Sequence, residues 1–106
     1  MASVSRLGAQ RKLRRYTETL RGQLPQLRAR FHVRYLGLFG SYVRGVPTKD
    51  SDLDVLVEFA EEPSLFKFME LENHLSELLR VKVDLVMKGT LKPLIGRRIL
   101  SEVVGL

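Results

Sequence analysis

Apolar residues recur every three or four positions along the first thirty residues of the chain, a spacing typical of helix. The recurring positions are Leu7, Leu13, Tyr16, Leu20, Leu24, Leu27 and Phe31. Gly22 and Pro25 interrupt the pattern, and proline lacks the N–H that a helix interior requires. The pattern therefore predicts one helix that ends near Arg21 and a shorter one that starts around Leu24.

Three short apolar runs further along the chain predict strands. Residues 33–39 and 53–59 are rich in β-branched, aromatic and leucine side chains, and the second run alternates apolar with polar positions. Residues 81–87 form a third run of the same kind. These three segments are the expected strands of a single sheet.

Two later stretches predict helices. The first runs from Leu65 to about Arg80, with Ser64 as its expected N-cap, and the second covers residues 92–104. The order is therefore α(α)-β-β-α-β-α, which predicts an α/β (α+β) fold, a small mixed β-sheet flanked by helices. The chain has 106 residues and we expect one domain, residues 1–106.

The charge of the chain is unevenly distributed. Residues 1–34 hold nine Lys/Arg and one acid, a net +8, whereas residues 35–106 hold nine Lys/Arg and eleven acids, a net −2. The basic part suits nucleic acid, nucleotide phosphates or an acidic protein partner. A solvated helix face rich in arginine is an equally good interpretation.

Composition and hydropathy exclude several classes of protein. Cysteine is absent, which removes disulfide and thiolate chemistry and fits a cytoplasmic protein. No run approaches the roughly 18–20 apolar residues that cross a bilayer. The basic N-terminus is not followed by an apolar segment with a cleavage site, which argues against a secretory signal. We therefore expect no membrane partner.

Two acidic residues stand where the second predicted strand begins. Asp52 and Asp54 are two positions apart, so an extended chain places them on one face, roughly 7 Å apart at the backbone. Carboxylate oxygens suit Mg²⁺, which binds one or two of them together with substrate phosphates. A pair of such ions is a recurrent device for displacement at phosphorus. An Asp-x-Asp pair alone is weak evidence, because acidic pairs are common at strand ends.

Asp84 strengthens the metal hypothesis. It lies within the apolar run 81–87, where an unpaired buried carboxylate would be costly. If the third strand lies beside the second, Asp84 can join Asp52 and Asp54 at one metal centre. A salt bridge with Lys82 and a position at a sheet edge are the alternatives.

Gly40 and Ser41 directly follow the first predicted strand. Glycine permits close approach of a ligand to the backbone, and a helical turn beginning at Ser41 would direct free N–H groups outward to phosphate oxygens. Arg44, one turn later, can supply positive charge to a triphosphate. A Gly-Ser pair carries weight only because a candidate metal site stands beside it.

These residues resemble a known signature. Gly40-Ser41, ten intervening residues and Asp52-x-Asp54 resemble the motif of the nucleotidyltransferases related to DNA polymerase β. Residues 36–59 are similar to the minimal nucleotidyltransferase (MNT) branch, although Val43 stands where that branch often has alanine. The matching residues are Phe39, Gly40, Ser41, Arg44, Gly45, Ser51, Asp52 and Asp54.

The resemblance extends over about residues 24–106. Residues 83–86 resemble the strand that carries the third carboxylate of the family, and the C-terminal stretch is similar to its closing helix. The resemblance implies a nucleotidyltransferase-fold core, with a basic N-terminal helix over residues 1–23 in front of it.

The family relationship implies a Mg²⁺-dependent transfer of AMP from ATP to a hydroxyl acceptor. Asp52 and Asp54 would hold two Mg²⁺ ions, and Asp84 would complete one metal site and help to deprotonate the hydroxyl. Ser41 and the Gly40 backbone would bind the β- and γ-phosphates, with Arg44 as a further nucleotide-binding residue.

The resemblance also implies a partner. Members of this branch often pair with a HEPN toxin, an RNase, and act as its antitoxin, some by adenylylating a tyrosine of the toxin. We therefore expect a hetero-oligomer with a HEPN-type protein.

Two other functions stay open, an antitoxin that acts by binding alone and a nucleic-acid binder that uses the basic segment. Three carboxylates together with Ser41 favour the enzyme. The few aromatics of the basic segment argue against direct nucleic-acid binding. The last predicted helix and the tail suit either a core or a partner surface, through Leu94, Ile95, Leu100, Val103, Val104 and Leu106.

Overall fold

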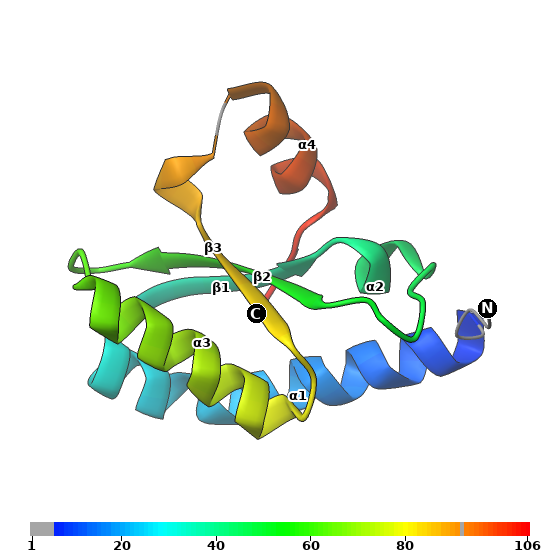
Figure 1. Cartoon of the computed structure of the whole chain (residues 1–106), viewed down its shortest axis with the longest axis horizontal. Helices are drawn as coiled ribbons and strands as arrows, with labels where there is room; N and C mark the ends of the chain where they lie inside the picture. The colour runs from blue at the N-terminus through cyan, green and yellow to red at the C-terminus, as the bar shows by residue number, and fades with distance from the viewer. Residues whose placement is uncertain (1–5, 92) are drawn as a thin grey trace.

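The computed structural model describes residues 6–91 and 93–106, which form a four-stranded mixed sheet with helices on both sides (Figure 1). The strand order is β3-β2-β1-β4. Strand β2 is parallel to β3 and antiparallel to β1, and β1 is antiparallel to β4. The strands are β1 (Val33–Phe39), β2 (Leu53–Phe59), β3 (Val83–Met87) and β4 (Val104–Gly105). The predicted fold class is confirmed.

The helices divide between the two sides of the sheet. Helices α1 (Arg6–Phe31) and α3 (Leu65–Leu79) lie together below the sheet in Figure 1, and α4 (Pro93–Glu102) lies above it. The single turn α2 (Ser41–Arg44) follows β1, and the 3-10 turn η1 (Lys88–Thr90) follows β3. Apolar side chains of α1, α3 and the lower sheet face form the core, among them Leu20, Leu27, Phe31, Leu36, Leu38, Leu53, Val55, Val57, Leu71, Leu75, Val83 and Leu85.

The alternation of side chains along β2 positions the candidate site. Leu53, Val55 and Val57 are buried in the core. Because neighbouring side chains of a strand point to opposite faces, Asp54 points to the face that α1 and α3 do not cover. Asp54 is partly buried there.

The predicted break in the first helix is wrong. Helix α1 continues unbroken through Pro25. Pro25 and Arg21 are both exposed, so the carbonyl that loses its N–H partner lies where water can solvate it. Leu20 and Leu27, on either side of the proline, are both buried in the core. Tertiary packing of the two halves thus outweighs the local preference of proline.

The other predicted elements are confirmed with altered bounds. Strands β1 and β2 match their predicted ranges, and Ser64 caps α3 by accepting a hydrogen bond from the Lys67 backbone N–H at 3.2 Å. Strand β3 begins at Val83 rather than at residue 81. Helix α4 ends at Glu102 rather than at residue 104, and residue 92 lies outside the described residues.

Strand β4 was not predicted, because its two residues are too few to show a pattern. It pairs with the middle of β1, where Gly37 opposes Gly105 and Leu38 opposes Val104. Among residues 6–91 and 93–106, no helix has both the length and the apolar character that a membrane span needs.

Candidate functional site

Strands β2 and β3 lie side by side, as the metal hypothesis requires. Asp54 and Asp84 are register partners on these parallel strands, so their α-carbons lie about 4.8 Å apart. Asp52 stands just before β2, two residues ahead of Asp54. The three predicted carboxylates therefore belong to the amino-terminal ends of two adjacent strands.

The pKa of Asp54 is raised by burial first and by neighbouring negative charges second. Burial raises its pKa from 3.8 to about 6, and the negative charges of Asp84 and Asp52 contribute to the rise. Arg44 lowers this pKa, and Glu102 raises it further. A cation between the carboxylates would remove the repulsion and favour the charged form of Asp54.

Asp84 differs from the expectation that it is buried. It is exposed on β3, an edge strand of the sheet. Within the part of the chain that the structure describes, it makes no ion pair with Lys82 or with another basic side chain. The cost of burying a charge therefore gives no argument for a metal at Asp84, and the sheet-edge alternative is the one observed.

The donor set fits Mg²⁺ when the ion is shared with a phosphate ligand. Across residues 6–91 and 93–106, no three acidic or histidine side chains group closely enough to hold a metal ion by themselves. Mg²⁺ commonly binds one or two protein carboxylates and completes its shell with water and substrate phosphates. Asp54 and Asp84, with Asp52 beside them, supply oxygen donors of this kind.

The turn between β1 and α2 fits closely against Asp54. Gly40 has φ 83° and ψ −157°, a conformation that is essentially restricted to glycine. A Cβ at this position would overlap the Asp54 carboxylate. Ser41 begins α2, as predicted, and its hydroxyl has no hydrogen-bond partner among the described residues.

Glu102, the last residue of α4, occupies two of the groups assigned to the nucleotide. Its Oε1 accepts hydrogen bonds from the Gly40 backbone N–H at 3.1 Å and from Arg44 Nη1 at 3.1 Å. Its Oε2 lies 3.3 Å from the same arginine nitrogen. A carboxylate thus sits where the sequence hypothesis places phosphate oxygens.

Sequence reasoning missed Glu102. The residue is 62 positions away from Gly40 and belongs to no recognised motif. The chemistry of Gly40 and Arg44 predicts that they attract an anion, but it does not tell which carboxylate of the chain reaches them.

A basic hollow opens beside Asp52, between α1, the loop before β2 and the turn before β3. Two of its basic side chains come from α1, so the basic N-terminal helix forms part of the surface next to the candidate site. The basic residues that line it are Lys12, Arg15, Lys49, Arg80 and Lys82.

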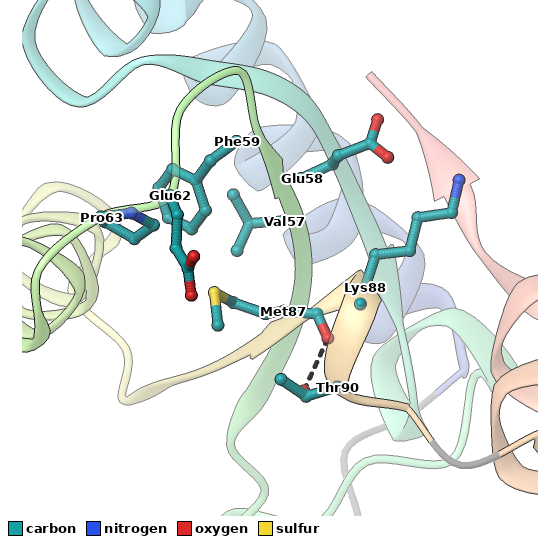
Figure 2. A pocket seen from close by; sticks show the side chains of 9 residues that line it. Val57, Glu58, Phe59, Glu62, Pro63, Met87, Lys88 and Thr90 are labelled. Atoms are coloured by element: carbon teal, nitrogen blue, oxygen red, sulfur yellow. Dashed lines mark hydrogen bonds between the residues drawn. The ribbon is translucent and has the colours of Figure 1, made fainter.

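Another hollow lies at the opposite, carboxyl-terminal ends of β2 and β3 (Figure 2). Val57, Phe59 and Met87 contribute apolar side chains to it, and Glu62 and Lys88 contribute charged ones. None of the predicted site residues lines this hollow. It therefore lies apart from the carboxylates.

Comparison with known proteins finds a matching family model and similar relatives. Residues 20–106 match the nucleotidyltransferase domain family. The protein adenylyltransferase MntA of Thermococcus cleftensis is 58% identical over 79 residues, which cover 74% of this chain and 80% of the relative.

Two solved structures extend the comparison. A chain assigned as a minimal nucleotidyltransferase is 34% identical with a TM-score of 0.72, covering 92% of this chain and 95% of the other. A toxin–antitoxin structure with AMP-PNP is 25% identical with a TM-score of 0.63, covering 84% of this chain and 67% of the other.

Proposed function

The chain belongs to the nucleotidyltransferase family, and from this premise we propose that it transfers AMP from ATP to a tyrosine of a partner HEPN toxin, acting as the antitoxin of the pair. The observation that carries the proposal is the register pairing of Asp54 with Asp84, with Gly40 fitted against the Asp54 carboxylate. The relative named as a protein adenylyltransferase supports a protein acceptor. The similar toxin–antitoxin structure with AMP-PNP supports ATP as the donor and a toxin as the partner.

The turn at the end of β1 binds the β- and γ-phosphates. The Ser41 hydroxyl has no partner among the described residues and can donate a hydrogen bond, and the Gly40 backbone N–H, now bonded to Glu102, is a second donor. Arg44 brings positive charge to the same place. Because Glu102 holds the Gly40 N–H and Arg44, its carboxylate leaves them as the nucleotide enters.

The three aspartate carboxylates would bind the metal ions and accept a proton from the attacking hydroxyl. Asp52, Asp54 and Asp84 would hold two Mg²⁺ ions, which when bound neutralise the charge that builds up on the phosphates. Asp84 accepts the proton of the acceptor hydroxyl, for which its exposed position at the sheet edge leaves access. The hydroxyl oxygen forms a bond to the α-phosphorus, the bond from this phosphorus to the bridging oxygen breaks, and pyrophosphate leaves. Positioning of the two reactants accounts for most of the rate enhancement.

Exposed apolar side chains on α4 support a protein partner. Leu94 is 80% exposed, Ile95 54% and Leu100 43%, so the alternative that they belong to the core is wrong for these three. Three exposed apolar side chains within one ten-residue helix are available for contact with a partner protein. We place the pair in the cytoplasm, in keeping with a chain free of cysteine.

The test is AMP incorporation into the partner. With ATP, Mg²⁺ and the cognate HEPN protein, mass spectrometry should find AMP on a tyrosine of the partner. The Asp52→Ala, Asp54→Ala double variant should abolish the transfer, because it removes two of the three carboxylates. Glu77→Ala, an exposed acid on α3 that lies outside the motif and does not line the basic hollow, is the control and should keep it.

The binding-only alternative predicts a different pair of results. The partner mass would stay unchanged with the wild-type protein, and the double variant would still neutralise the toxin. That combination would exclude the enzymatic function.

A further inference from the structure

The basic hollow beside Asp52 gathers five cationic side chains, of which Arg15 lies over the Tyr16 ring, its guanidinium carbon 5.4 Å from the ring centroid. Within the described residues none of the five takes part in an ion pair or a side-chain hydrogen bond. Asp50 and Asp52 are the acids that line the hollow, which leaves a formal charge of +3. Like charges held together repel one another, and an anionic ligand would relieve that repulsion. The five residues are Lys12, Arg15, Lys49, Arg80 and Lys82.

Arg80 stands in this hollow against its backbone preference. It follows α3 with φ 54° and ψ 40°, in the left-handed region that glycine usually occupies at the end of a helix. A residue with a Cβ is less stable there than glycine by about 1 kcal/mol. This less stable backbone conformation places the Arg80 guanidinium group at the hollow. Backbone strain of this kind is often found at binding sites.

The hollow continues as a groove between α1 and α3. Arg15, Tyr16 and Arg80 line both the basic hollow and a second one, which Thr19 and Leu78 extend along the two helices. Figure 1 shows α1 and α3 side by side below the sheet. A groove that leads to Asp52 suits an extended segment of chain better than a single small anion.

The aromatic residues of the hollow favour a peptide over a nucleic acid. Tyr16 is 3% exposed and Tyr42 5%, and their rings pack edge to face with centroids 5.7 Å apart. Neither ring offers a free face for a base, although base stacking is a main source of single-strand binding. Carboxylates need only the cationic side chains.

The strand order connects this groove to the path of the acceptor. The turn assigned to the β- and γ-phosphates follows β1, which lies on one side of β2, and β3 lies on the other side. In-line displacement brings the attacking hydroxyl from the side opposite the leaving pyrophosphate. With the phosphates over the turn after β1, as proposed, that side is toward β3, whose start carries Arg80 and Lys82.

We propose that the groove between α1, the loop before β2 and the start of β3 binds an acidic segment of the acceptor protein, next to the hydroxyl that receives AMP. The groove thereby selects the acceptor. This inference rests on the proposed function, since it takes a protein as the acceptor. It also gives the basic N-terminal helix a role in that reaction.

The test uses labelled synthetic peptides and the full chain, without ATP or metal, in low-salt buffer. One peptide carries a tyrosine between runs of glutamate, and its partner carries glutamine in place of every glutamate. Fluorescence anisotropy should show at least tenfold tighter binding of the glutamate peptide, with an affinity that falls as salt rises.

Charge-removing variants locate the binding. Arg15→Gln combined with Lys82→Gln should weaken binding of the glutamate peptide about tenfold. Arg28→Gln combined with Arg34→Gln removes the same charge from exposed positions outside the groove and should change the affinity less than twofold. Arg80→Gly should weaken binding and leave Tm equal or higher, because glycine relieves the left-handed backbone.

Three results would overturn the inference: equal binding of the two peptides, unchanged binding after loss of Arg15 and Lys82, or tighter binding of a single-stranded RNA of equal charge. Because the assay contains no nucleotide, its failure would leave AMP transfer to the partner standing. Loss of AMP transfer with intact, charge-dependent peptide binding would count against the proposed function alone.

Discussion

At the scale of single residues, the site depends on how closely Gly40 approaches Asp54. Gly40 and Gly45 both have a positive φ, 83° and 77°. A Cβ on Gly40 would overlap the Asp54 carboxylate, whereas the nearest atom to a Cβ on Gly45 is 3.9 Å away, in the Arg6 side chain. Gly40 has ψ −157°, in a region essentially restricted to glycine, whereas Gly45 has ψ 21°, in the left-handed helical region. The two glycines therefore differ both in backbone strain and in the space around a Cβ.

We predict that Gly40→Ala lowers the free energy of unfolding by about 3 kcal/mol, since it adds a steric overlap to backbone strain. Gly45→Ala should cost only about 1 kcal/mol, from the backbone alone. Urea denaturation of the two variants measures both values. Equal losses would mean that neither the overlap with Asp54 nor the special backbone conformation of Gly40 contributes to stability.

The raised pKa of Asp54 makes the stability of the protein depend on pH. Below pH 3.8 the carboxyl is protonated in the folded and unfolded chains, and between 3.8 and about 6 only the folded chain keeps the proton. The contribution of Asp54 to stability is therefore present at low pH and is lost as pH rises to 6. An asparagine side chain at the same position has no proton to lose and would not suffer this loss.

In metal-free buffer, Asp54→Asn should therefore raise Tm at pH 8 and leave it nearly unchanged at pH 4, each relative to the wild type at that pH. Partial exposure screens the repulsion, so we expect about 1 kcal/mol, or about 4 °C. Differential scanning calorimetry at the two pH values measures the effect. A variant less stable than the wild type at pH 8 would show that the carboxylate is stabilised there rather than repelled.

The residues of the site differ in how far the sequence could reveal them. Gly40, Ser41, Asp52 and Asp54 lie within fifteen positions, so the family signature that they resemble can be recognised in the sequence itself. The assignment of Asp84 to the site depended on the pairing of β2 with β3, which the structure shows. Glu102 and the basic hollow arise from tertiary packing of segments far apart in the chain, and no local pattern contains that information.

At the scale of elements, Glu102 ties the end of α4 to the turn after β1. Its bonds to Gly40 and Arg44 hold the end of α4 against this turn. A triphosphate must compete with this carboxylate for the same donors. Under the proposed function, helix α4 would therefore be coupled to occupation of the nucleotide site.

We predict that Glu102→Gln raises the affinity for ATP about fivefold, because a neutral amide no longer repels the phosphates or pairs with Arg44. A fivefold change corresponds to about 1 kcal/mol, the upper range for a partly exposed ion pair. Isothermal titration with ATP and Mg²⁺ measures it. Glu77→Gln, an exposed position on α3, is the control and should leave the affinity unchanged. Weaker ATP binding by Glu102→Gln would show that Glu102 supports the site instead of competing for it.

The elements themselves were predictable where burial repeats regularly along the chain. Strands β1 and β2 and helix α3 follow from their apolar patterns and from Ser64 as a cap. Pro25 misled the prediction because its exposed position lets water solvate the free carbonyl, which a local rule does not include. Strand β4 forms by pairing with the edge of β1. Such pairing depends on the whole sheet, so the two residues of β4 do not reveal it in the sequence.

At the scale of the whole molecule, the protein should be stabilised much more by metal and nucleotide bound together than by either ligand alone. Among the described residues no three acidic or histidine side chains form a metal cluster, so an ion bound without phosphate would have few protein ligands. A nucleotide without the ion would place its charges against Asp52, Asp54 and Asp84. Each ligand alone should therefore bind weakly.

We accordingly predict that Mg²⁺ alone and ATP alone each shift Tm by no more than about 2 °C, whereas both together raise it by about 8 °C or more. Ligand at 100 times its Kd stabilises a protein by about 2.7 kcal/mol, and about 4 °C per kcal/mol is expected for a domain of this size. Asp84→Asn should lose most of the joint shift, and the control Glu77→Ala should keep it. If Mg²⁺ alone produced the full shift, the three carboxylates would form a metal site without the nucleotide, and the dependence on phosphate argued from their arrangement would be wrong.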